Sequence, residues 1–137
     1  LVNELTGYEN IILPIMLDKK KVDEKYIDKI ISMLGIEDRL SHLPSALSGG
    51  QQQRIAIARA LANKPSILFA DEPTGNLDEA NSWEIMKLLE NANEQGTTVV
   101  VVTHNLEIVR AMRKRTITIE NGHLVHDIEE GGNFYEI

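Results

Sequence analysis

Two short apolar runs on either side of a long helical segment restrict the folds open to this chain. Residues 66–70 and 97–102 consist mostly of Ile, Leu, Phe and Val. Unbroken apolar runs of this length are typical of parallel strands that are covered on both faces. Residues 79–94 predict a long helix between them, which is the kind of connection that parallel strands need. We therefore expect an α/β fold with a mostly parallel sheet.

The chain before the first of these strands reads as a series of helices. A short helix is expected to begin at Tyr8 and to be ended or kinked by Pro14. Apolar residues recur at helical spacing over residues 22–34, and Gly35 is a natural stop for that helix. A third helix is expected over residues 49–63. Its inward-facing residues should be Ile55, Ala58, Leu61 and Ala62, and its outward-facing residues Gln51, Gln52 and Gln53.

The pattern after the second strand predicts a shorter helix over residues 106–112 and then a hairpin. Residues 115–120 and 123–128 are the expected hairpin strands, and Asn121-Gly122 is a dipeptide typical of a tight turn. The order of elements predicts one mostly parallel sheet with an antiparallel edge, followed by a loose tail that begins at Glu129.

The size of the chain is compatible with one domain in two parts. With 137 residues and 42% hydrophobic content, the chain can form a modest core. We place a helical subdomain at residues 1–64 and a sheet-bearing part at residues 65–137. The longest apolar runs, such as residues 11–17, are too short to span a membrane.

The charge balance and the lack of cysteine narrow the possible partners. The formal net charge is −7, which argues against nucleic acid or an anionic membrane as a partner over the whole surface. Two basic clusters, Lys19 to Lys21 and Arg110 to Arg115, are interpreted as solvated helix ends. Without cysteine the chain has no disulfide framework and no thiolate metal site, which fits a cytosolic protein.

A serine and two glycines lie at the predicted start of the third helix. Ser48, Gly49 and Gly50 occupy positions where the backbone N–H groups have no partner within the helix, and glycine lets an anion approach closely. The alternative is an N-cap serine followed by two turn glycines, which is the usual meaning of such a tripeptide. The Gln51–Arg54 segment that follows, together with the strand after it, favours phosphate binding.

Two adjacent carboxylates end the first predicted strand, at the edge where open α/β sheets bind ligands. Asp71 and Glu72 would repel each other unless a cation or bound water compensates them. Mg²⁺ beside a triphosphate meets that need, with Asp71 holding the ion and Glu72 orienting and deprotonating the attacking water. The alternative is a pair of surface charges that begin a loop. Pro73 restricts the exit of the chain and makes a disordered loop a poorer explanation.

Asp78 and His104 are two further candidates. Asp78 is expected to cap the helix that starts at Glu79, and a catalytic role is compatible with capping. His104 follows the second strand as Glu72 follows the first, so neighbouring strands should bring both side chains toward the same phosphate. The alternative is a structural histidine, which is the more common role at a strand end. The remaining histidines, which we expect at the surface, are His42, His123 and His126.

These motifs resemble the C-terminal portion of an ABC transporter ATP-binding subunit, which has a P-loop NTPase-like fold. Residues 47–51 (LSGGQ) match the signature of that family, and residues 67–72 match its second nucleotide-binding motif. Residues 75–78 resemble its D-loop, and His104 its switch histidine. The resemblance covers essentially the whole chain. It implies ATP and Mg²⁺ as cofactors.

The resemblance also implies residue roles and partners. Family members close head-to-tail around two nucleotides, so the signature segment would contact the γ-phosphate of ATP held by a second ATP-binding subunit. An integral membrane permease or an FtsX-like protein would be the further partner, which implies a cytoplasmic subunit on the inner face of the cell membrane. The implied catalytic residues are Glu72, His104 and Asp78, the cofactor-binding residues Ser48, Gly49, Gly50 and Gln51, and the metal ligand Asp71.

One element of the family pattern is missing, because no G-x-x-x-x-G-K-[ST] phosphate loop occurs in the 137 residues. The resemblance places that loop before Leu1, together with an adenine-stacking aromatic residue and a glutamine-bearing loop. We therefore expect a fragment that alone binds ATP weakly and does not hydrolyse it. Part of the cover of strands 67–70 and 99–102 should come from the missing elements, so the chain alone should expose an apolar patch. Two interpretations stay open: part of an energy-transducing ATPase subunit, or a non-catalytic regulatory or degenerate module that keeps only the fold.

Different segments of the chain resemble different branches of the family. Residues 70–78 resemble the group that contains lipoprotein-release, macrolide and peptide exporters and the FtsE-type cell-division ATPases. Residues 81–86 and 112–115 are most like the cell-division type, whereas residues 8–17 are more like the exporter ATPases. Cell division is slightly favoured.

Overall fold

The computed structural model describes residues 1–129, which form two compact units that meet at the Val102–Thr103 bond in the chain. The expected loose tail lies, apart from Glu129, outside these residues. The first unit contains α1 (Gly7–Leu17), α2 (Glu24–Leu34), η1 (Glu37–Arg39), η2 (Pro44–Ala46), α3 (Gly49–Leu61), β1 (Ile67–Asp71), α4 (Glu79–Glu94) and β2 (Thr98–Val102). The second contains α5 (Leu106–Met112), β3 (Thr116–Glu120) and β4 (His123–Ile128).

Helix α1 begins with a reciprocal cap and continues through its proline. The Thr6 hydroxyl accepts a hydrogen bond from the Glu9 backbone N–H over 3.3 Å, and the Glu9 carboxylate accepts one from the Thr6 N–H over 2.8 Å. Pro14 does not end the helix, and a kink at Pro14 stays a prediction. Ile11 and Ile15 lie on either side of the proline and are both buried, and α1 packs on α3. This burial stabilises the helix beyond the hydrogen bond that proline cannot make.

Helices α2 and α3 confirm the sequence pattern more closely. Asp23 caps α2 by accepting from the Tyr26 N–H over 3.2 Å, and Gly35 closes the helix in the left-handed conformation. The predicted inner face of α3 is buried: Ile55, Ala58, Leu61 and Ala62. The glutamines expected to face outward are instead half-buried. Gln52 donates through Nε2 to the carbonyls of Pro44 and Leu47, and this holds the loop that leads into α3.

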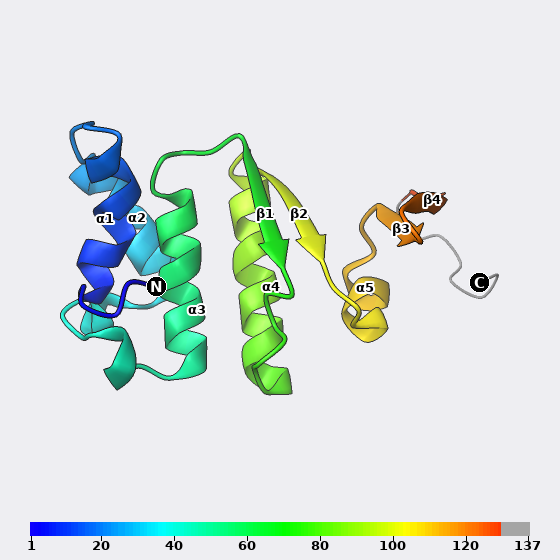
Figure 1. The fold of residues 1–137 in the computed structure, drawn as a ribbon, viewed down its shortest axis with the longest axis horizontal. Helices are drawn as coiled ribbons and strands as arrows, with labels where there is room; N and C mark the ends of the chain where they lie inside the picture. The colour runs from blue at the N-terminus through cyan, green and yellow to red at the C-terminus, as the bar shows by residue number, and fades with distance from the viewer. Residues whose placement is uncertain (130–137) are drawn as a thin grey trace. The chain divides into compact units, whose positions relative to one another are not determined.

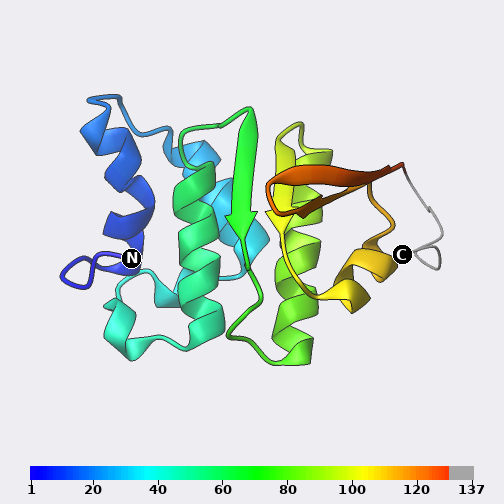
Figure 2. The ribbon, with the colours of Figure 1, turned by 45° about the vertical axis from the view of Figure 1, so that its right-hand side comes forward.

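Strands β1 and β2 pair in parallel, as expected, with Ile67 opposite Thr98 and Asp71 opposite Val102. Figures 1 and 2 show α1, α2 and α3 grouped together and α4 running along the β1–β2 pair, and α4 contacts β2. The expectation that this chain alone leaves an apolar face of these strands exposed is confirmed for the described residues. Leu68 on one face is only 7% exposed, whereas Phe69 on the opposite face is 73% exposed.

Strands β3 and β4 form the predicted antiparallel hairpin. Asn121 and Gly122 have φ values of 49° and 79°, the left-handed geometry that a tight hairpin turn requires. A register shift at Thr118 and Ile119 interrupts the pairing. The antiparallel edge expected on the parallel sheet is wrong, because β3 and β4 form a separate two-stranded sheet among the described residues. The local turn is sufficient to pair the two strands without the parallel sheet.

The compact units do not coincide with the predicted parts. Residues 1–64 and 65–102 both lie in the first unit, so the boundary expected at residue 64 stays a prediction about subdomains. Within the part of the chain that the structure describes, no helix has the length and apolar character needed to cross a bilayer.

Candidate functional site

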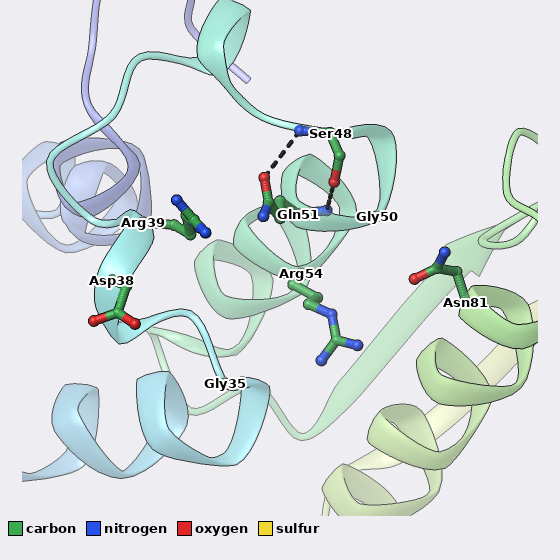
Figure 3. Close-up of a pocket in the computed structure, with 8 residues that line it drawn as sticks. All are labelled: Gly35, Asp38, Arg39, Ser48, Gly50, Gln51, Arg54 and Asn81. Carbon is green, nitrogen blue, oxygen red and sulfur yellow. Dashed lines mark hydrogen bonds between the residues drawn. The ribbon is translucent and has the colours of Figure 1, made fainter.

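The amino end of α3 is held by a reciprocal cap. The Ser48 hydroxyl accepts a hydrogen bond from the Gln51 backbone N–H over 3.3 Å, and the Gln51 side-chain oxygen accepts one from the Ser48 N–H over 3.0 Å. These are the two dashed contacts in Figure 3. The N-cap role considered for Ser48 is therefore confirmed. Gln51 fixes the conformation of the residue before the helix.

This cap leaves donors at the same end of the helix. The helical geometry gives the N–H groups of Gly49 and Gly50 no acceptor within α3. The Ser48 hydroxyl accepts in the cap, so its own proton is still able to point at a further acceptor. The positive end of the helix dipole adds to this donor set. Capping and anion binding are compatible at this helix end.

A polar pocket of about 370 Å³ lies at this end of α3. Figure 3 shows side chains from η1, α3 and α4 arranged around it. Its charged lining residues are one aspartate, Asp38, and two arginines, Arg39 and Arg54, of which Arg54 is ion-paired with Glu84. The full lining is Gly35, Asp38, Arg39, Ser48, Gly50, Gln51, Arg54 and Asn81. A polar pocket with helix N–H donors suits an anion.

The two carboxylates lie where β1 ends, as expected. Asp71 is the last residue of the strand and is exposed, and Glu72 is half-buried. The Glu72 N–H donates to the Val102 carbonyl over 2.8 Å, so the pairing of β1 with β2 continues one residue past the strand. Glu72 has a φ of 45°, which is uncommon for a residue other than glycine. Such backbone strain recurs at functional sites.

The chain that leaves β1 is an ordered turn. Pro73 and Thr74 are both buried. The Gly75 N–H donates to the Glu72 carbonyl over 3.1 Å, and the Leu77 N–H donates to the Thr74 carbonyl over 3.1 Å. This turn disfavours the interpretation of Asp71 and Glu72 as charges that begin a loose loop.

Asp78 caps α4, as the sequence predicted. Its Oδ1 accepts from the Asn81 N–H over 2.9 Å, and its Oδ2 accepts from the Asn81 side-chain amide over 2.7 Å. The hydrogen bond from the Asn81 backbone, followed by that from the Asn81 side chain, lowers the pKa of Asp78. The carboxylate is therefore held in its charged form.

His104 lies in the segment between β2 and α5. Asn105 next to it caps α5 by accepting from the N–H groups of Glu107 and Ile108, and its own N–H donates to the Thr103 hydroxyl over 3.1 Å. The approach of His104 to Glu72 stays a prediction, since the two residues belong to different units. His123 is exposed, as expected. His42 and His126 are half-buried, so they are partly exposed at the surface.

The magnesium proposal passes a simple test of donor chemistry. Among the described residues, no group of three His, Cys, Asp or Glu side chains lies close enough to hold a metal ion. Mg²⁺ commonly takes one or two protein carboxylates and completes its shell with phosphate and water. The exposed Asp71 carboxylate at the strand end fits that kind of site.

The comparisons with known proteins decide the family. A family model described as ABC transporter matches residues 1–75, which is more than half of the chain. The chain belongs to the ABC transporter family. Its likeness to that family, expected from the motifs, is confirmed, and the fold class is confirmed with it.

Individual relatives of this ABC chain come from two branches. It is 46% identical over 138 residues to the cell division ATP-binding protein FtsE of Streptococcus pneumoniae, which covers 99% of the chain. It is 48% identical over 130 residues to the lipoprotein-releasing system ATP-binding protein LolD of Aquifex aeolicus, covering 93% of the chain. These matches span 60% and 58% of the two relatives, so the chain corresponds to about three fifths of their length.

A solved structure of an ATP-binding cassette also matches this chain. The ATP-binding cassette MJ0796, determined as a dimer in a post-hydrolysis state with ADP and Pi, matches with a TM-score of 0.79. The two sequences are 39% identical, and the match covers 98% of this ABC chain and 60% of the other.

The motifs of the ABC chain did not predict the contacts of three residues that shape its candidate site. Gln52 holds the loop before α3, Arg54 lines the pocket, and Asn81 binds Asp78. The signal that the sequence does carry is Asp78 itself, a preferred N-cap residue whose acceptor receives the N–H of Asn81 three residues later. The neighbours of Gln52 and Arg54 depend on tertiary packing and have no local signal.

Proposed function

We propose that the chain supplies part of an ATP site in an ABC transporter ATP-binding subunit, which couples ATP binding and hydrolysis to a membrane partner. The observation that carries this proposal is the polar pocket at the start of α3, whose lining includes Ser48, Gly50 and Arg39 together with the helix N–H groups. This donor set is suited to a terminal phosphate. Membership of the family supports ATP as the source of that phosphate.

The second half of the proposed chemistry lies at the end of β1. Asp71 would hold Mg²⁺, and the ion when bound would neutralise phosphate charge. Glu72 would accept a proton from water through its carboxylate, while the hydrogen bond to Val102 fixes its backbone. His104 would donate a hydrogen bond to phosphate. Asp78 would be a further catalytic residue, positioned by the turn before α4.

A second ATP-binding subunit is part of this proposal. The signature segment, Ser48 to Gln51, and the carboxylate pair lie on different elements of the chain, α3 and the end of β1. In a head-to-tail dimer each nucleotide would meet the carboxylates of one subunit and the signature segment of the other. The solved relative MJ0796 is itself described as a dimer, which supports this arrangement.

We place the protein on the cytoplasmic side of the cell membrane, bound to an integral membrane partner. The FtsE-type cell-division role is the first candidate, because several relatives of 42% to 46% identity carry that name. Lipoprotein or related export is the second candidate, supported by LolD at 48% identity. A non-catalytic ABC module remains the alternative, since the 137 residues contain no phosphate loop.

The decisive experiment uses what we call the fusion protein, in which Leu1 is joined to an upstream segment of a family member that contains a G-x-x-x-x-G-K-[ST] loop. We expect the fusion protein to hydrolyse ATP in the presence of Mg²⁺. Replacement of Glu72 by Gln should lower the rate by about 10²- to 10⁴-fold, as expected for loss of a general base. ATP binding without any hydrolysis by the parent fusion protein would favour the non-catalytic alternative.

A further inference from the structure

The amino ends of α3 and α4 meet at a glycine and an asparagine. A Cβ placed on Gly50 would stand 3.2 Å from the side-chain oxygen of Asn81, which is tighter than ordinary van der Waals contact. Figure 3 shows Gly50 on α3 and Asn81 on α4 at the border of the same pocket. The glycine thus allows α3 to approach α4 at this point.

Asn81 is itself restrained by its other contacts. Its side-chain nitrogen donates to Asp78 over 2.7 Å, and its backbone N–H donates to the same carboxylate over 2.9 Å. The amide oxygen therefore faces Gly50 while the amide nitrogen is fixed on Asp78. A side chain held at both ends cannot easily move away from an added Cβ.

A second link joins the same two helices further along. Arg54 forms a hydrogen bond and an ion pair with Glu84 of α4, and its other terminal nitrogen donates to the Leu34 carbonyl at the end of α2 over 2.9 Å. One guanidinium therefore connects three helices. Contacts at two levels resist rotation of α3 against α4 better than one contact does.

We propose that Asn81 is a positioning residue, which holds Asp78 and the glycine end of α3 as one unit when the signature segment meets the opposite nucleotide. This inference rests on the proposed function and goes beyond the signature, the second nucleotide-binding motif, the D-loop and the switch histidine, because Asn81 lies outside these four motifs. Its consequence is that Ser48 and Asp78 reach the partner subunit together.

Gly49 provides a control within the same helix turn. A Cβ on Gly49 would meet only Leu77, at 3.7 Å, which is an ordinary contact. A substitution at Gly49 should therefore disturb anion approach without any effect on the packing of α3 against Asn81. A substitution at Gly50 should disturb both the approach of an anion and the packing of α3 against Asn81.

The first test is a double-mutant cycle on the 137-residue chain, followed by thermal unfolding. Gly50→Ala should lower the melting temperature by a few degrees in the parent chain, where the added methyl group meets Asn81. In the Asn81→Ala background the same change should be neutral or stabilising. Gly49→Ala should give the same shift in both backgrounds. Equal shifts for Gly50→Ala in the two backgrounds would overturn the inference.

The second test uses ATP hydrolysis by the fusion protein. Asn81→Ala should lower kcat by about tenfold at unchanged KM for ATP, which corresponds to about 1.4 kcal/mol in the barrier. Asn81→Ser keeps a hydroxyl donor for Asp78 and should recover part of the rate. Asn91→Ala, an exposed change on the same helix, should leave kcat unchanged.

The two tests separate the two proposals. If Asn81→Ala lowers only the melting temperature and leaves kcat per folded protein unchanged, the positioning role is wrong and the proposed function stands. If the parent fusion protein does not hydrolyse ATP, the proposed function fails, while the unfolding cycle still decides whether Asn81 and Gly50 are coupled.

Discussion

The Glu72 backbone N–H donates to the carbonyl of Val102 over 2.8 Å, one residue beyond the last paired positions of β1 and β2. This bond fixes the proposed general base against the strand from which His104 follows. The backbone of Glu72 has a φ of 45°, a conformation that β-strand pairing alone does not require. The fold thus determines where the carboxylate leaves the sheet, and the turn through buried Pro73 and Thr74 restricts its movement.

The exposed face of the parallel strands should drive self-association of the isolated chain. Phe69 is 73%, Val102 55% and Ile67 52% exposed on that face. We expect Phe69→Thr to reduce association in sedimentation experiments and to change stability little, because threonine is compatible with a strand. Leu68→Ala on the buried face should cost about 2 to 5 kcal/mol of unfolding free energy. A monodisperse parent chain would contradict the role of this face.

The sequence predicted the elements around the site well for a physical reason. Capping residues such as Ser48 and Asp78 and the Asn121-Gly122 turn act through neighbours a few residues away, so their signals are local. An exposed apolar face on the two parallel strands was predicted because elements that would cover it are missing from the pattern. The contacts of Arg54 depend on which elements pack together, so no local signal predicts them. Whether the helix would end at Pro14 was left open for the same reason, since its continuation depends on packing on α3.

Removal of the cap hydroxyl at α3 should weaken folding by a modest amount. Ser48→Ala removes the acceptor for the Gln51 N–H and should cost about 0.5 to 2 kcal/mol in chemical denaturation. Thr6→Ala removes the corresponding acceptor at α1 and is the matched control, with a similar expected loss. In the fusion protein, Ser48→Ala should also impair ATP hydrolysis, whereas Thr6→Ala should not. Equal hydrolysis by both variants would contradict a phosphate-binding role for Ser48.

The charge of Asp78 should make a small contribution to stability that depends on pH. Its pKa is lowered in the folded state by hydrogen bonds from Asn81, so the stabilisation is present above the ordinary carboxyl pKa of about 3.9. It is lost as the pH falls from that value through the lower, folded pKa. NMR titration of the carboxyl carbon should show this low pKa and a rise toward the ordinary value in Asn81→Ala. An unchanged titration in that variant would contradict the role of the side-chain amide.

The 137-residue chain should bind ATP weakly by itself. It contains the proposed signature segment and carboxylates, but no G-x-x-x-x-G-K-[ST] loop to supply the backbone N–H groups and lysine that surround the β- and γ-phosphates. Equilibrium titration with a fluorescent ATP analogue should therefore give only weak binding, and no phosphate release should follow. Low-micromolar affinity for the analogue would contradict this expectation.

The most direct test of the composite site is sedimentation of the Glu72→Gln fusion protein with and without ATP. Glutamine keeps the shape of the side chain and removes the base, so the protein should bind ATP, dimerise and remain closed. Adding Ser48→Arg should occupy the space proposed for the γ-phosphate of the nucleotide held by the partner subunit. The protein should then remain a monomer in the presence of ATP. If the Ser48→Arg variant dimerised with ATP as readily as Glu72→Gln alone, the assignment of the α3 pocket to the partner's nucleotide would be wrong.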